Sequence, residues 1–150
     1  MATVRRKSST RVGKRRSFER KHYNYGRWTK GRFSEAVTVT GPAKMIFLAG
    51  IGSEHEQTGR IMHPGDFDAQ CRYAFRKLKK VLAKNGARLS DVVKQVTYVT
   101  DARYVSQAGE RRREAYGGAP LPAHTFVNVS QLAWPDMMVE IDVIAMVPVR

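Results

Sequence analysis

The 150-residue sequence predicts an α+β domain in which two helices pack on one face of a mixed β-sheet. Three observations predict this class. Short apolar or alternating segments are typical of strands, two longer segments repeat apolar residues at three- and four-residue spacing, and Gly or Pro residues separate the segments. The expected order of elements is β-β-α-β-α-β-β.

The first two expected strands lie at 36–40 and 45–49. The first, Ala-Val-Thr-Val-Thr, alternates with period two and is followed by a Gly-Pro turn. The second is continuously apolar, which is typical of a strand that is covered on both faces. Gly50 and Gly52 end it, and the polar residues 53–64 are expected to form a loop.

The clearest helix is expected at 66–84, where apolar residues follow a helical period and an Asn-Gly pair supplies the stop. A second helix fits 104–116, which two glycines follow. Strands at 93–100, 124–129 and 138–147 complete the sheet, because each is a short run rich in β-branched or aromatic residues.

Positive charge is concentrated at the N-terminus. The chain has a formal net charge of +14, and residues 1–32 contain 12 basic residues and one acidic residue, against 15 and 12 in the rest. Residues 1–21 have almost nothing to bury, so we interpret them as a disordered basic arm. Residues 22–32 form an aromatic and basic lead-in segment, and residues 33–150 form the globular domain.

Composition excludes several classes of protein. A hydrophobic content of 42% is too high for a wholly disordered chain, and no apolar run approaches the ~18 residues of a membrane-spanning helix. Cys71 is the only cysteine, which rules out an intrachain disulfide and a cysteine-rich zinc site. We therefore expect a cytoplasmic protein without a metal or other cofactor. A transit peptide is the alternative interpretation of the Arg- and Ser-rich arm.

Six segments, in this order, resemble the Rid family, the reactive intermediate deaminases formerly called YjgF-like proteins. They lie at 32–37, 47–50, the helix containing Gln70 and Leu78, 89–94, 122–125 and 139–141. The resemblance extends from about Phe33 to the C-terminus and leaves the arm unmatched. It implies a chorismate-mutase-like fold, assembly as a homotrimer, and ligand clefts between neighbouring subunits.

The resemblance also implies site residues. Family members that hydrolyse 2-imino and 2-enamino acids carry an arginine after Pro-Ala, which grips the substrate carboxylate, and here that position holds His124. A tyrosine of the family is replaced by Phe33, and a common cysteine by Phe126. Glu140 stands at the position of the water-handling carboxylate, and Gly50 matches the pocket glycine. The chain is thus similar to a divergent member that lacks the clamping arginine.

His124 and Glu140 are the candidate catalytic pair, and we expect them to approach each other because they lie on strands predicted to be adjacent. A histidine whose pKa is near neutrality can shuttle protons, and a carboxylate can position water. By its residue pattern alone His124 fits a packed strand histidine better, and the family position favours the catalytic role. Candidates for substrate contact are Phe33, Ala49, Gly50, Ile51 and Phe126, and candidates to replace the carboxylate clamp are Arg27 and Arg32.

Two functions remain open at this point. The first is a deaminase-like hydrolase that acts on the C–N bond of an imine, enamine or related small amino compound. The second is a non-catalytic trimer that binds a ligand or nucleic acid, in which the basic arm contacts phosphates and Tyr23, Tyr25 and Trp28 stack on bases. Residues 111–113, three consecutive arginines, are expected to be a solvated helix face, with anion binding as the alternative.

Overall fold

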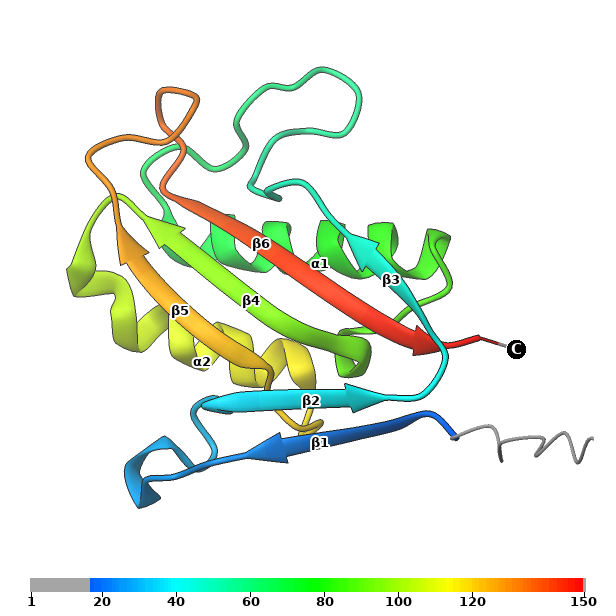
Figure 1. Cartoon of the computed structure of the whole chain (residues 1–150). Helices are drawn as coiled ribbons and strands as arrows, with labels where there is room; N and C mark the ends of the chain where they lie inside the picture. Colours follow the sequence, from blue (N-terminus) through cyan, green and yellow to red (C-terminus); the bar gives the residue numbers. More distant parts are fainter. Residues whose placement is uncertain (1–16, 150) are drawn as a thin grey trace, which may run out of the picture.

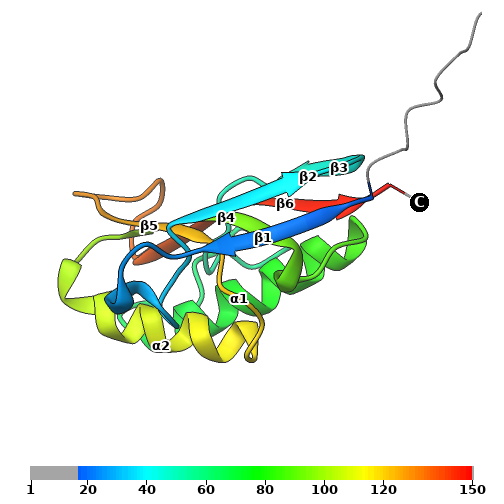
Figure 2. The ribbon, with the colours of Figure 1, turned by 60° about the horizontal axis from the view of Figure 1, so that its bottom comes forward.

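The computed structural model describes residues 17–149 and consists of a β-sheet with two helices on one of its faces (Figures 1 and 2). The helices are α1 (Phe67–Lys84) and α2 (Val105–Tyr116). The strands are β1 (Glu19–Tyr23), β2 (Ala36–Thr40), β3 (Ala43–Phe47), β4 (Val92–Val99), β5 (Ala123–Asn128) and β6 (Val139–Pro148). Short 3-10 turns occur at Arg27–Thr29, Leu89–Asp91 and Ala102–Tyr104.

Four strands form the main sheet in the order β3-β6-β4-β5. Strand β5 runs parallel to β4, whereas β6 is antiparallel to both β3 and β4. Strands β1 and β2 form a separate antiparallel pair. The mixed sheet with both helices on one face confirms the predicted α+β class, and the structure adds β1 ahead of the predicted order.

The core lies between α1 and the middle of the sheet. Residues Ala74, Leu78 and Leu82 of α1 are fully buried at helical spacing, and every second residue of β6 from Val139 to Ala145 is buried against the helices. Helix α1 begins after Asp66, whose side chain accepts a hydrogen bond from the Ala69 amide at 3.0 Å. The helix predicted at 66–84 is therefore confirmed to within one residue.

Strand β1 was not predicted. Residues 19–21 belong to it, so the expectation of disorder through residue 21 is wrong for them, whereas residues 1–16 lie outside the described residues. The Arg20 guanidinium donates hydrogen bonds to the Ser90 carbonyl at 2.6 Å, to Asp91 at 3.1 Å and to the Met146 carbonyl. Because these acceptors lie about 70 or more residues away in sequence, the local composition of the arm gave no sign of them.

Strand β3 was expected to be covered on both faces, and in the single chain this is wrong. Met45 and Phe47 are 51% and 68% exposed, while Ile46 between them is buried. The reason is that both helices lie on one face of the sheet, and successive strand residues point to opposite faces. The other face of β3 therefore presents apolar side chains to the outside. Among residues 17–149, no helix is both long and apolar enough to cross a membrane.

Candidate functional site

The two candidate catalytic residues lie on opposite faces of the sheet. His124 is paired with Gln95 of β4, and Glu140 is paired with Tyr98 of the same strand. Because Gln95 and Tyr98 are three residues apart on one strand, their side chains, and those of their partners, point to opposite faces. The expectation that His124 and Glu140 occupy adjacent strands and approach each other is wrong within one chain, since β4 separates β5 from β6.

On the helix face, a chain of hydrogen bonds ends at His124. The Tyr116 hydroxyl donates to Gln95 Oε1, Gln95 Nε2 donates to Thr97 Oγ1, and Thr97 Oγ1 is bonded to His124 Nε2, each at 2.9 Å. Since Thr97 accepts from Gln95, its own proton can be donated to His124 Nε2. In that arrangement the imidazole carries its proton on Nδ1, which forms no hydrogen bond with any described residue.

His124 is not suited to the proton-shuttle role that was expected of it. Burial, followed by the positive charges of Arg112 and Lys94, lowers the pKa of His124 to about 3. At neutral pH the ring is neutral and its Nε2 is engaged by Thr97. When Thr97 donates to Nε2, His124 offers a ligand a single N–H donor at Nδ1.

His124 lines a cavity of about 610 Å³ between β5, α2 and the lead-in segment. Three other predicted site residues, Phe33, Phe126 and Arg32, also line it, and Arg27 does not. The Phe33 ring lies edge-on to Trp28 with ring centroids 5.5 Å apart, and its centroid is 6.5 Å from that of His124. The cavity therefore combines aromatic walls with the imidazole.

Arg112 of α2 also lines this cavity, and the sequence interpretation had grouped it with Arg111 and Arg113 as a solvated helix face, with anion binding as the alternative. The residue is only 7% exposed, so the expectation of a solvated helix face is wrong for this arginine. Its Nη2 donates to the Arg32 carbonyl, its buried Nε has no partner among the described residues, and burial lowers the pKa of Arg112 to about 10. Helical spacing could have indicated the burial of Arg112, because Ala108 and Tyr116, four residues before and after it, are buried too.

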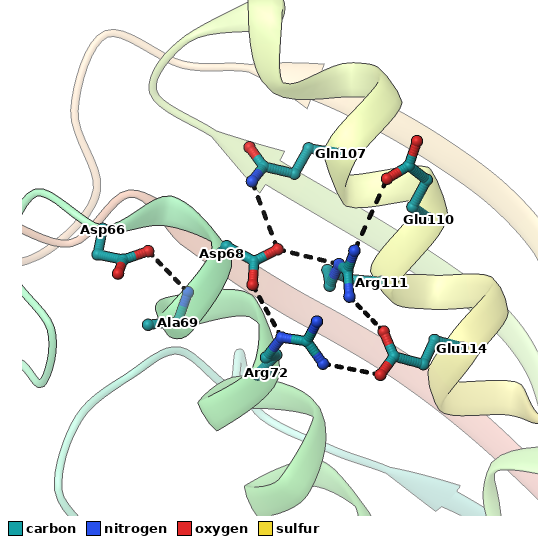
Figure 3. Close-up of polar contacts among 8 residues, drawn as sticks. All are labelled: Asp66, Asp68, Ala69, Arg72, Gln107, Glu110, Arg111 and Glu114. Atoms are coloured by element: carbon teal, nitrogen blue, oxygen red, sulfur yellow. Dashed lines mark hydrogen bonds and ion pairs between the residues drawn. The ribbon is translucent and has the colours of Figure 1, made fainter.

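A network of charged side chains fixes α2 against α1 (Figure 3). Asp68 of α1 pairs with Arg72 at 2.8 Å and with Arg111 of α2 at 3.0 Å. Glu114 of α2 pairs with Arg72 at 2.7 Å and also with Arg111. Each partly exposed pair contributes little stability by itself, and the network joins α1 to the side of α2 that carries Arg111. Arg111 is used in this network, and Arg112 is left facing the cavity.

Glu140 stands in a separate niche beside Gly50. A Cβ atom at Gly50 would lie 1.6 Å from Glu140 Oε1, so the carboxylate occupies the room that the glycine leaves. Backbone hydrogen bonds of 2.8 and 2.9 Å between Ile51 and Ile141 hold the two segments together, with Ala49 just before the glycine. Burial, and then the charges of Glu54 and Asp142, raise the pKa of Glu140.

Cys71 is the single thiol of the chain, and His, Cys, Asp and Glu side chains are the usual metal ligands in proteins. Cys71 is 1% exposed and burial raises its pKa to about 12, which fits the inert buried thiol expected for it. Within residues 17–149, no three His, Cys, Asp or Glu side chains are grouped closely enough to hold a metal ion.

Comparison with known proteins identifies the family. The family model described as endoribonuclease L-PSP matches residues 27–147. The chain therefore belongs to this family, which also contains the proteins called Rid, RutC and YjgF. The resemblance inferred from six short segments is thereby confirmed.

Several relatives show how far the similarity extends. A RutC family protein from Pyrococcus abyssi is 34% identical over 77% of this chain and 86% of its own length. TdcF from Escherichia coli, provisionally named a reactive intermediate deaminase, is 27% identical over 67% of this chain and 78% of its own length. The crystal structure of the Rid family protein YyfB from Yersinia pestis is similar with a TM-score of 0.75 and 28% identity, and covers 85% of this chain and 98% of its own.

Proposed function

We propose that the protein is a hydrolase that acts on the C–N bond of an imine, an enamine or a related small amino compound. The observation that carries this proposal is the niche in which Gly50 makes room for Glu140, a half-buried carboxylate whose pKa is raised. Such a carboxylate can take a proton from water and return it at a pH near neutrality. The deaminase name given to TdcF supports the same chemistry.

The site is proposed to lie between subunits of a homotrimer. Its two halves point away from each other in one chain, because His124 faces the helices and Glu140 faces the other side of the sheet. A neighbouring copy would bring its Glu140 niche to the cavity of the first. Met45 and Phe47, which are exposed in the single chain, supply apolar surface for such an assembly. A cytoplasmic location also remains a prediction.

The reaction is proposed to run in two steps. Water adds to the carbon of the protonated imine while the Glu140 carboxylate accepts one water proton, which forms a neutral carbinolamine. The protonated Glu140 then gives that proton to the amine nitrogen, the C–N bond breaks with release of ammonia, and the hydroxyl proton passes to solvent as the carbonyl forms. One water is consumed, and one ammonia and the proton carried by the protonated imine are released. In this scheme His124 acts as a hydrogen-bond donor to the substrate, in place of the proton shuttle first expected.

Glu140→Gln tests this role. The amide keeps the size of the side chain and removes its ability to accept a proton, so ammonia release from freshly generated imines should fall at least about 100-fold. Glu19→Gln is the matched control, because it makes the same chemical change at an exposed carboxylate of β1 that does not belong to the Glu140 niche. If purified protein hydrolyses no imine or enamine offered, or if Glu140→Gln retains the full rate, the proposal is wrong.

A second candidate function is binding of single-stranded nucleic acid, without catalysis, by a trimer. The observation that favours it is the exposure of aromatic side chains beside basic ones: Tyr25 and Trp28 are 87% and 65% exposed, next to Arg27 and Lys30. Bases can stack on such rings while the cations contact phosphates. The Tyr25→Ala, Trp28→Ala double variant should weaken binding of a labelled oligonucleotide at fixed salt, and an unchanged affinity would refute this function.

A further inference from the structure

We infer that Arg112 binds a carboxylate group of the ligand in the cavity beneath α2, and so takes the place of the clamp that His124 cannot provide. The inference rests on the proposed function in one respect, namely that the carboxylate belongs to the substrate. The candidates suggested by the sequence, Arg27 and Arg32, do not fit this role as well. Arg27 does not line the cavity, and the side chain of Arg32 is exposed.

The burial of Arg112 without an acidic partner is the first argument. Its guanidinium has five N–H donors, and the described residues satisfy one nitrogen of the three, through the Arg32 carbonyl. No carboxylate of the described residues forms an ion pair with Arg112, although the residue is 93% buried. A buried cation in this state is strongly destabilising unless an anion compensates it.

The charges around the cavity are the second argument. Arg32, Arg112 and Arg113 line it, and Glu110 is the one acidic residue among the lining side chains. Glu110 lies on the exposed side of α2 and pairs with Arg111 at 3.7 Å. The lining therefore carries an excess of positive charge, which attracts an anion rather than a cation.

The donors of His124 and Arg112 are the third argument. With Thr97 as the donor to its Nε2, His124 has an N–H at Nδ1 for a ligand, and the charge of Arg112 contributes to keeping the imidazole neutral. One charged and one neutral donor that face the same cavity suit the two oxygens of a carboxylate. The rings of Phe33 and Phe126 line the remaining wall, and they suit a short apolar chain attached to that carboxylate. The ligand class is thus a small organic acid.

Binding of 2-oxobutanoate and of its uncharged amide, measured by calorimetry on the full chain, tests the inference. The acid should bind at least about tenfold more tightly than the amide, and Arg112→Gln should remove this difference, because a hydrogen bond to a charged group is involved. Arg112→Lys keeps the positive charge and should recover part of this difference in affinity. Arg76→Gln is the control, because Arg76 is an exposed arginine of α1 outside the cavity, and its loss removes one positive charge.

Each outcome decides the matter. Equal binding of acid and amide by the unmodified protein would overturn the inference, as would an unchanged preference for the acid in folded Arg112→Gln. If that variant does not fold, the unmodified protein still decides, because 2-oxobutanoate and not the amide should shift the NMR signals of the Arg112 side chain. Preference for the acid without imine hydrolysis would support the inference while the proposed function fails. Imine hydrolysis without a preference for the acid would support the proposed function and overturn the inference.

Discussion

Replacing His124 should change how the stability of the protein depends on pH. The pKa of His124 is lowered from its ordinary value of 6.5 to about 3, mainly by burial. The folded protein therefore leaves this ring neutral, whereas the unfolded chain protonates it once the pH falls below about 6.5. The unfolded state then binds more protons than the folded state, so stability is lost as the pH falls through this range.

The size of this effect follows from the two pKa values. At pH 7.5 the two states differ hardly at all in protons bound by this group. At pH 5 the linkage relation gives a free energy of unfolding about 2 kcal/mol lower than at pH 7.5. Partial exposure of the ring makes this an upper value, since solvent screens the effect. A loss of that size is a large part of the stability of a typical domain.

Urea unfolding at pH 7.5 and at pH 5 provides the assay. We expect the His124→Gln variant to lose about 2 kcal/mol less than the unmodified protein between the two pH values, because glutamine does not titrate. NMR of the histidine ring protons gives an independent check, since the His124 signals should not move between pH 5 and pH 8. A titration of His124 near pH 6.5, or identical pH dependence in the two proteins, would refute the reasoning.

Two further predictions concern the supports of the site. Gly50→Ala should lower the hydrolysis rate by about 100-fold, because the new methyl group would lie 1.6, 2.5 and 2.8 Å from Oε1, Cδ and Cγ of Glu140 and must displace this side chain. A rate within threefold of normal in the folded variant would show that the carboxylate position does not matter. Gln70→Leu should destabilise the fold by about 3 kcal/mol in urea unfolding, because this fully buried side chain satisfies three backbone groups. Those groups are His63 O, Asp136 O and Met138 N. A loss below about 1 kcal/mol would show that water replaces the amide there.

The predicted elements were located well where the signal is local. The helix at 66–84 and the strand at 36–40 agree with the structure because apolar period and capping residues act over a few positions. The strand predicted at 45–49 begins two residues earlier, since Ala43 and Lys44 pair with the end of β6. Strand β1 was missed because its stability depends on pairing with β2 and on the distant partners of Arg20.

The sequence predicted several residues of the candidate site, but it did not predict how these residues are arranged relative to one another. The motif positions indicated Glu140, Gly50 and His124, and the first two are neighbours in the structure. Glu140 and His124 do not meet within one chain because strand order decides which faces meet, and strand order is set by contacts between distant segments. Arg112 was not distinguished from Arg111 and Arg113, because three consecutive arginines on a helix look alike until the orientation of the helix is known.

The sequence by itself determined the fold class, the family and most helix and strand positions, because periodicity and motif spacing are properties of nearby residues. Only the tertiary structure decided that the basic segment from residue 19 joins the fold, that His124 stays neutral, and that Arg112 rather than Arg27 faces the cavity. The physical reason is common to all three. Burial and hydrogen-bond partners set the state of a charged or polar side chain, and both come from residues far away in the chain.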